Sequence, residues 1–409
     1  MQTRLPDALT QTSAGREAEG ILRACVHCGF CNATCPTYRL LGDELDGPRG
    51  RIYLIKSMLE GAPASDVTRH HLDRCLTCRA CETTCPSGVA YGQLLDLGRD
   101  AVERQTRRPL AQRLERWMLR HVLRVPGRFR TALRLAHGLK QGLPARWRGA
   151  LPRPAAPVTT RWPDARHARR MLVLGGCVQP VLAPTIDLAA AQVLDRLGIS
   201  LLRVAQSGCC GALDYHLSAP ADAAAAMRRT IDACWPLIEA GAEAIVQTAS
   251  GCGVMVKDYG RVLRDDPVYA GKAARVSALA RDIGEVLAAE PLEALTDLRP
   301  CRLAFHAPCT LQHGQRLGGV IEGILTRLGF ELTPVPDAHL CCGAAGTYGF
   351  SQPELAGRLR AEKLRALEGA APELIATANI GCCSHLELEA AVPVRHWIEL
   401  LVGPGPTDA

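Results

Sequence analysis

The sequence predicts a multidomain α+β protein, in which an all-helical domain precedes a duplicated α/β half with parallel strands. Three observations predict this fold class. Eight of the 19 cysteines lie in two tight runs within the first 100 residues. Further cysteine blocks recur at a fixed distance in the second half, where short apolar runs alternate with helical patterns. A chain of 409 residues has room for these several domains.

We expect four segments along the chain. They are a helical metal-binding domain (1–100), a basic helical connector and linker (101–168), and two α/β domains (169–290 and 300–403).

The cysteine content indicates metal binding. An odd number of cysteines, many in C-x-x-C spacing, favours metal ligation over disulfides in an intracellular chain. The first 20 residues have no apolar signal core, and no apolar run approaches the roughly 18 residues of a membrane span. We therefore expect a cytoplasmic metalloprotein.

The two N-terminal runs have the spacing of iron–sulfur ligands. They read C-x-x-C-x-x-C-x-x-x-C-P and begin at Cys25 and Cys75. Three closely spaced cysteines can hold one cubane, while the fourth usually binds the other cluster. Zinc sites, the alternative, usually show paired C-x-x-C units. We predict two [4Fe-4S] clusters, the first held by Cys25, Cys28, Cys31 and Cys85 and the second by Cys75, Cys78, Cys81 and Cys35.

The connection between the two runs predicts helices. It has 39 residues and places Leu, Ile and Met at helical spacing in LLGDELDGPRGRIYLIKSMLEG. Small β-type ferredoxins have a shorter connection, so this region resembles the all-helical electron-exit domain of succinate dehydrogenase-type iron–sulfur subunits.

The positive charge is concentrated in the connector. Between Arg99 and Arg170 there are 19 basic and four acidic residues, although the whole chain carries only +7. Its helical part alternates Arg with Leu, and LPRPAAPVTTRWPD reads as a linker. The simplest expectation is a helix pair with its apolar stripe packed on the redox domains and Arg in solvent. A partner subunit or an anionic membrane surface remains as an alternative, and no nucleic acid is expected.

The second half contains an internal repeat. Cys177 is followed 32 residues later by Cys209-Cys210-Gly211, and Cys309 by Cys341-Cys342-Gly343 at the same distance. The copies are offset by 132 residues, and Cys252 matches Cys382 two residues short of that offset. This register indicates a duplication.

Each cysteine block follows a predicted strand. The strand-type runs are MLVLGG (171–176), LLRV (201–204), AIVQT, RLAFH (302–306), FELTPV (330–335) and LIATA (374–378). Parallel sheets gather ligands at the carboxyl ends of their strands, so the four cysteines of each copy should converge. These two groups are Cys177, Cys209, Cys210 and Cys252, and Cys309, Cys341, Cys342 and Cys382. They suit an additional iron–sulfur cluster, zinc or redox thiols.

Four histidines lie near these blocks and could be ligands or proton carriers, although such residues more often make local hydrogen bonds. They are His216, His306, His313 and His385.

The repeats resemble the CCG domain of the heterodisulfide reductase catalytic subunit, which carries noncubane iron–sulfur clusters. The resemblance rests on SGCCGAL, HAPCTLQH and LCCGAAGTYGF. That family ends each copy with C-x-x-C. Here Cys252 and Cys382 lack a cysteine three residues further on, so one ligand of the noncubane pattern is missing.

The whole chain resembles the glycolate oxidase iron–sulfur subunits, through the motifs above and CVHCGFCNATCPTY, GPRGRIYLIK and CLTCRACETTCPSGV. No dinucleotide or nucleotide motif is present. The resemblance implies a flavoprotein partner with FAD that oxidises glycolate to glyoxylate, and an acceptor that is not oxygen, plausibly quinone. It also allows a peripheral position on the inner face of the cytoplasmic membrane. Related subunits serve lactate and glycerol-3-phosphate dehydrogenases. A thiol–disulfide reductase using the CCG cysteines is the alternative of another class.

Overall fold

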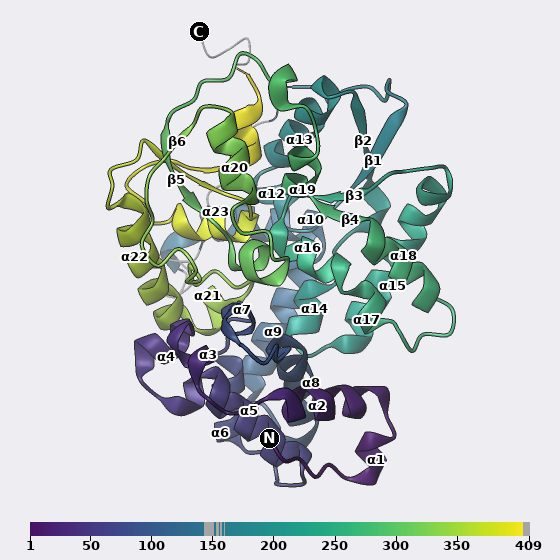
Figure 1. The fold of residues 1–409 in the computed structure, drawn as a ribbon, viewed down its shortest axis with the longest axis vertical. Coiled ribbons are helices and arrows are strands. Elements are labelled where there is room, and N and C mark those ends of the chain that lie inside the picture. The colour runs from purple at the N-terminus through teal and green to yellow at the C-terminus, as the bar shows by residue number, and fades with distance from the viewer. Residues whose placement is uncertain (143–150, 153–154, 156–157, 159, 404–409) are drawn as a thin grey trace.

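The structure, a computed structural model, describes residues 1–142, 151–152, 155, 158 and 160–403. Figure 1 shows the helical N-terminal domain below two α/β units that lie side by side. This arrangement confirms the predicted fold class. Part of the linker predicted at 151–164, namely residues 153–154, 156–157 and 159, lies outside the described residues.

The N-terminal domain contains only helices and turns. Two left-handed residues, Gly29 (φ 87°) and Arg79 (φ 59°), turn the chain within the cysteine runs immediately before α3 and α7. Gly98 allows α8 to lie close to α5, because a Cβ there would meet Ile55 Cγ1 at 2.6 Å. The helices are α1 Asp7–Thr10, α2 Ser13–Ala24, α3 Phe30–Ala33, α4 Pro36–Leu41, η1 Glu44–Asp46, α5 Pro48–Leu59, α6 Asp66–Asp73, α7 Ala80–Thr84 and α8 Tyr91–Gln105.

The first α/β unit has a parallel four-stranded sheet of order β2-β1-β3-β4. Its strands are β1 Arg169–Leu174, β2 Ile199–Val204, β3 Ile245–Gln247 and β4 Ala280–Asp282. Its helices are α12 Gln179–Leu182, α13 Thr185–Arg196, η3 Ala205–Ser207, α14 Ala212–His216, α15 Pro220–Glu239, α16 Ser250–Lys257, α17 Tyr259–Val262, α18 Ala270–Leu279, α19 Ile283–Ala288 and η4 Leu292–Ala294.

The second α/β unit repeats this topology with the order β6-β5-β7-β8, again all parallel. Its strands are β5 Arg302–His306, β6 Glu331–Leu332, β7 Leu374–Thr377 and β8 Val394–His396. Its helices are the π-helical η5 Thr310–Gly314, α20 Val320–Arg327, α21 Tyr348–Ser351, α22 Pro353–Glu368, α23 Ile380–Leu386 and the 3₁₀ helix η6 Trp397–Leu401. The matching strand order supports the duplication inferred from the cysteine spacing.

The sequence did not predict the edge strands β4 and β8, and β6 is shorter than the run FELTPV. β4 and β8 each have three residues, too few for an alternating pattern to be recognised. They become strands by pairing with β3 and β7.

A single hydrophobic core joins the two α/β units. It includes Val246 from the first sheet and Leu303 from the second, together with the fully buried Trp397. Ser250 N donates to Ala378 O at 3.2 Å, and His396 Nε2 donates to Thr248 O at 2.8 Å. Because these contacts lie just beyond β3 and β7 and at the end of β8, the carboxyl ends of the two sheets come together.

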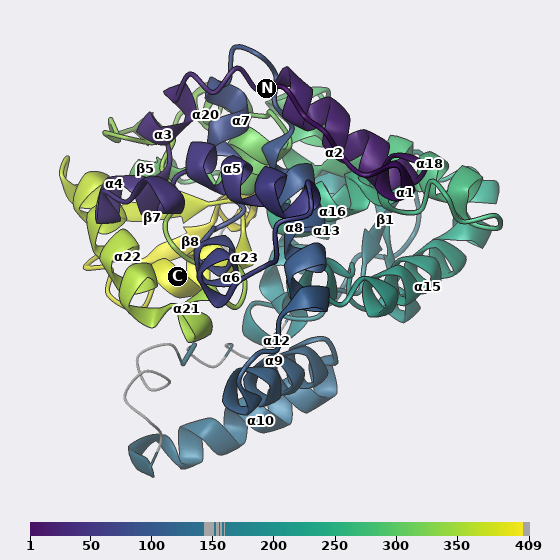
Figure 2. The same cartoon turned by 90° about the horizontal axis from the view of Figure 1, so that it is seen from below.

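The connector forms a helical hairpin of α9 Leu110–Leu123 and α10 Pro126–Gly138, followed by η2 Lys140–Gly142. Figure 2 shows the hairpin at one side of the molecule. Phe129 and Leu133 of α10 pack on Val181 of α12. The hairpin therefore rests on the first α/β unit.

The hairpin was expected to pack its apolar stripe on the redox domains and to turn its arginines to solvent, and this expectation is wrong in part. Arg116 of α9 pairs with Asp73 at 2.9 Å and Arg120 with Asp214 at 2.6 Å, so part of the arginine row faces the body of the molecule. Five apolar residues are instead exposed: Leu110, Leu114, Trp117, Leu135 and Leu139. Acidic groups on neighbouring domains account for this reversal, and helical periodicity alone could not predict it.

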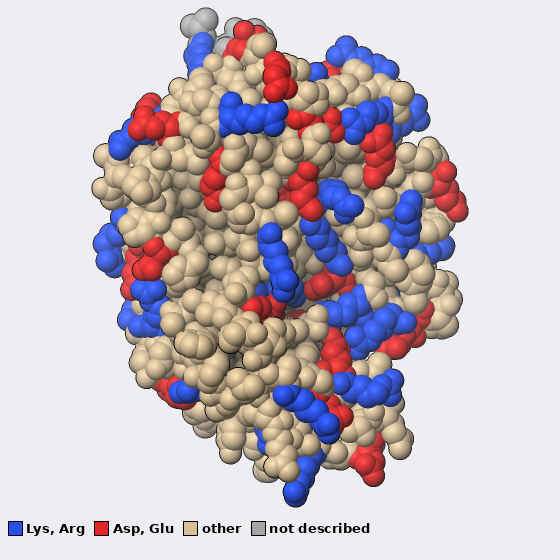
Figure 3. All heavy atoms as spheres, viewed as in Figure 1, with Lys and Arg blue, Asp and Glu red and all other residues tan. Residues whose placement is uncertain are grey.

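Charges of both signs are interspersed over the face drawn in Figure 3. No helix among the described residues combines the length and the apolar character needed to cross a bilayer.

Candidate metal centres

The first predicted ligand set lies around one pocket near the molecular surface. Cys25, Cys28, Cys31 and Cys85 all line it, although Cys85 comes from the second run. Burial and, to a smaller extent, the neighbouring thiols of Cys25, Cys85 and Cys28 together raise the pKa of the Cys31 thiol to about 11. Such a crowded group of thiols is held as thiolates only when a cation compensates their charge, which fits iron.

The second predicted set gathers in the interior. Burial raises the pKa of the Cys81 thiol well above its usual value, and the thiols of Cys78, Cys75 and Cys35 raise it further. All four side chains are buried. Cys35 of the first run thus lies beside the cysteines of the second run. In the same way, Cys85 of the second run lies beside the cysteines of the first. The geometry fits the crossed assignment.

The two sets differ in exposure. Cys28 is exposed and both Cys31 and Cys85 are half-buried, whereas the second set is buried throughout. Phe30, next to the first set, is 64% exposed. Cys81 lines the pocket of the first set as well, so the two sites are adjacent. The first site is therefore partly open to solvent, and the adjacent second site is enclosed by protein.

A buried ion-pair network lies next to the second set. The Arg51 guanidinium is completely buried and lies 3.3 Å from Asp46, while its Nη1 lies 4.0 Å from Cys35 Sγ. Arg74 contacts the other Asp46 oxygen at 2.8 Å. Tyr91 donates its hydroxyl hydrogen to Cys75 Sγ at 3.6 Å. Cations and hydrogen bonds beside cluster sulfurs raise a cluster's reduction potential.

Asp43, Asp46 and His71 also lie close enough together to hold a metal ion. Asp46 is already neutralised by Arg51 and Arg74, and Asp43 is exposed. This group is therefore an ion-pair network.

All eight predicted cysteines of the repeats line one cavity of about 340 Å³. Cys75 and Cys78 of the helical domain line it too, as does Leu123 of α9. The cavity thus lies where the helical domain, the hairpin and both α/β units meet. The sequence predicted two convergent groups, and the structure brings both to the same space.

The second repeat makes the closer contact with the buried set. Cys309 Sγ lies 3.8 Å from Cys341 Sγ. Cys78 and Cys341 belong to one apolar cluster, with Cys309 packed against it. A metal centre bound by the buried set is therefore next to the cysteines of the second repeat.

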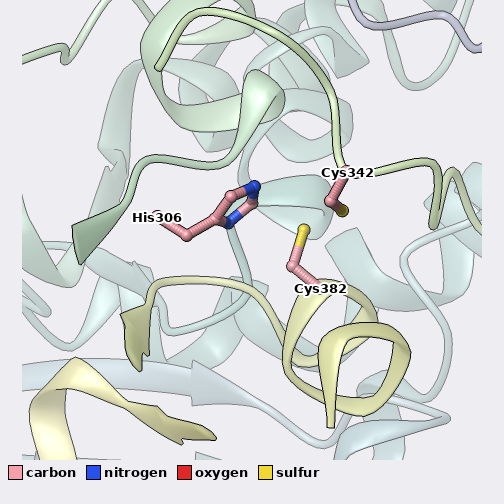
Figure 4. A group of neighbouring side chains, drawn as sticks. All are labelled: His306, Cys342 and Cys382. Carbon is pink, nitrogen blue, oxygen red and sulfur yellow. The ribbon is translucent and has the colours of Figure 1, made fainter. Parts of the chain in front are cut away.

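The four histidines have different environments. His313 Nδ1 lies 2.8 Å from Thr83 Oγ1 and its Nε2 donates to His339 O at 2.9 Å, so both ring nitrogens are satisfied. His385 Nε2 donates to Ala356 O at 3.3 Å. His216 is partly exposed and lies 3.7 Å from Asp96. The fourth, His306, faces the side chains of Cys342 and Cys382, as Figure 4 shows.

Sequence reasoning missed Arg51, Asp46 and Tyr91. These residues lie 11 to 16 positions from the cysteine that each of them approaches. A buried arginine within GPRGRIYLIK, between two cysteine runs, is the signal that could have indicated a charged neighbour of the cluster.

Comparison with known families agrees with this architecture. The family described as 4Fe-4S dicluster domain matches residues 21–89, and the family described as cysteine-rich domain matches residues 171–257 and 303–387. The fold and the cysteine sites thus define an iron–sulfur protein with a dicluster domain and two cysteine-rich domains.

Relatives of nearly full length identify the family more closely. The chain is 56% identical to the glycolate oxidase iron-sulfur subunit of Escherichia coli (strain K12) over 98% of both chains. It is 31% identical to the probable glycolate oxidase iron-sulfur subunit of Bacillus subtilis (strain 168), over 91% of this chain and 90% of the relative. The chain belongs to the family of glycolate oxidase iron–sulfur subunits. Lactate utilization protein A of Bacillus licheniformis is 28% identical over 55% of this chain.

Proposed function

We propose that this chain is the electron-transfer subunit of a cytoplasmic, flavin-dependent glycolate dehydrogenase complex. A partner subunit carries FAD and oxidises glycolate to glyoxylate, and electrons then pass through this chain to an acceptor other than oxygen. We assign one [4Fe-4S] cluster to Cys25, Cys28, Cys31 and Cys85 and the other to Cys75, Cys78, Cys81 and Cys35. Each cluster supplies a one-electron carrier, and we assign glycolate oxidation to the partner subunit.

The difference in burial between the two cysteine sets is the main support for this proposal. An exposed first site suits exchange with a partner protein, and the buried second site adjoins both the first site and the cavity. Electrons would enter at the surface and leave through the cavity. Apolar side chains such as Val173, Leu174 and Met255 line the cavity and suit a quinone ring.

The composition of the native complex tests the proposed partner and substrate. The full chain, tagged and isolated anaerobically from its own cells, should copurify with a flavoprotein. Glycolate should bleach the visible absorption of the iron–sulfur clusters faster than lactate or glycerol 3-phosphate does. Absence of flavin, or faster bleaching by either of the other two substrates, would contradict the assignment.

The alternative function, a thiol–disulfide reductase that uses the cysteines of the repeats, makes a different prediction. If the chain had that function, Cys341→Ser would abolish disulfide reduction while both cubanes survived. We expect instead that the wild-type complex has no disulfide-dependent turnover.

The hairpin supports a further part of the proposal, contact with an anionic membrane surface. Leu114 and Trp117 are exposed on α9 beside the exposed Arg113, and Arg130 and Arg134 are exposed on α10. The helices contain one acid, Glu115. Exposed Leu and Trp among arginines match the apolar boundary and negative headgroups of a bilayer. Because Leu123 lines the cavity, this contact would bring the cavity near lipid.

Vesicle flotation tests the membrane contact. The complex should float with phosphatidylglycerol vesicles at low salt, and Leu114→Glu with Trp117→Glu should weaken binding on the order of tenfold or more, because burial of each side chain contributes about 1.5–3 kcal/mol. Val268→Glu is the control, since Val268 is also exposed (68%) but lies outside the hairpin. Absence of flotation at low salt, or equal weakening by the control, would exclude this surface.

A further inference from the structure

Three side chains from neighbouring strands converge in the second repeat (Figure 4). His306 ends β5, Cys342 follows β6, and Cys382 lies in α23 after β7. The strand order β6-β5-β7 places these three positions at the same edge of the sheet. A ring nitrogen of His306 and the two Sγ atoms all lie within 4.8 Å of one another.

His306 has one ring nitrogen without a partner. Its Nδ1 lies 2.9 Å from Thr377 Oγ1, and among the described residues its Nε2 has no hydrogen-bond partner. The side chain is only 2% exposed. An unpaired buried polar atom is costly, and an Nδ1–H bond to Thr377 leaves the Nε2 lone pair free to bind a metal ion.

The two cysteines need a cation if they are to ionise. Cys342 and Cys382 are 1% and 3% exposed. Asn379 Nδ2 donates to Cys382 Sγ at 3.5 Å, a contact suited to a thiolate. A divalent ion would balance two thiolates and a neutral imidazole, so the buried site would carry no net charge.

We propose that His306, Cys342 and Cys382 bind a single zinc ion. Tetrahedral zinc has ligand bonds of about 2.0–2.3 Å, and adjustments of about 1 Å would bring the three groups to that distance. Both cysteines line the central cavity, so the fourth coordination position opens toward it. Water or a small anionic ligand fills that position. Three protein ligands with one open position are typical of zinc sites that act on a ligand.

The first repeat lacks this site. Its residue at the position of His306 is Leu174, which ends β1 as His306 ends β5. Ala249 stands where the second repeat has Asn379, three residues before the corresponding cysteine. The proposal therefore requires one zinc ion per chain. It concerns this chain's own residues and does not depend on the substrate of the complex.

Metal analysis of the full chain tests the proposal. Protein purified anaerobically without chelators or nickel resin should contain about one zinc in addition to the iron of two cubanes, about eight per chain. His306→Leu, which copies the first repeat, should lower zinc content at least tenfold and leave iron unchanged. His313→Leu is the matched control, because His313 is also a buried histidine of this repeat but has both ring nitrogens bonded.

A second variant separates ligand loss from misfolding. His306→Cys restores a metal-binding side chain and should retain the ion, and its cobalt-substituted form should show stronger sulfur-to-metal charge-transfer absorption than wild type. Four results would overturn the proposal: wild-type protein without zinc, full zinc retention in His306→Leu, additional iron and sulfide in place of zinc, or a Cys342–Cys382 disulfide.

Discussion

Cys85→Ser will remove or alter the cluster held by the first cysteine run, although Cys85 belongs to the second run. Cys85 lines the pocket formed by Cys25, Cys28 and Cys31. If the altered cluster is lost, iron should fall from about eight to about four per chain. Electron paramagnetic resonance of the reduced protein should show the signal of the buried cluster alone.

Cys35→Ser is the reciprocal variant and serves as the control. Its side chain neighbours Cys78 and Cys81, so the surface cluster should remain while the buried cluster is lost or altered. Damage to the cluster of its own run in either variant would contradict the crossed assignment. Each variant is a control for the other, because both replace the fourth cysteine of the same motif in its two copies.

Arg51→Leu will destabilise the helical domain. Arg51 and Asp46 are both completely buried, and removal of one partner of a buried ion pair typically costs about 3–5 kcal/mol. Loss of the guanidinium also removes a cation close to Cys35 Sγ, so the reduction potential of the buried cluster should fall. Anaerobic thermal unfolding should show a midpoint lower by several degrees, and redox titration should show the shift in potential.

Arg23→Leu is the control for this variant. Arg23 pairs with Glu19 at 2.6 Å, but its side chain is 64% exposed, so the change should cost less than about 1 kcal/mol. Equal thermal stability of Arg51→Leu and wild type would show that the buried pair contributes nothing to the fold.

The sequence was sufficient to predict the main architecture, because cysteine spacing and strand periodicity are local signals. The runs beginning at Cys25 and Cys75 predicted two clusters, and the 39-residue connection between them predicted helices. The 132-residue offset predicted a duplication, and the short apolar runs predicted its parallel strands. The convergence of cysteines at strand ends followed from the general geometry of parallel sheets.

Other features depend on contacts between distant segments. The single cavity shared by both repeats requires the packing of the two sheets and the helical domain, which no repeat encodes alone. The inward orientation of Arg116 and Arg120 depends on Asp73 and Asp214 in other domains. Sequence reasoning treated His306 as one of four equivalent histidines. Its distinction is that an unpaired ring nitrogen lies beside Cys342 and Cys382, which depends on how three strand ends meet.

The difference in exposure between the two cysteine sets also has a consequence for damage by dioxygen. An oxidant diffusing from solvent reaches the site of Cys28 before it reaches the buried set. If electrons enter at the first site, as proposed, oxidation should first interrupt their entry, while the second site is damaged later. A protein damaged in this way fails by ceasing to accept electrons.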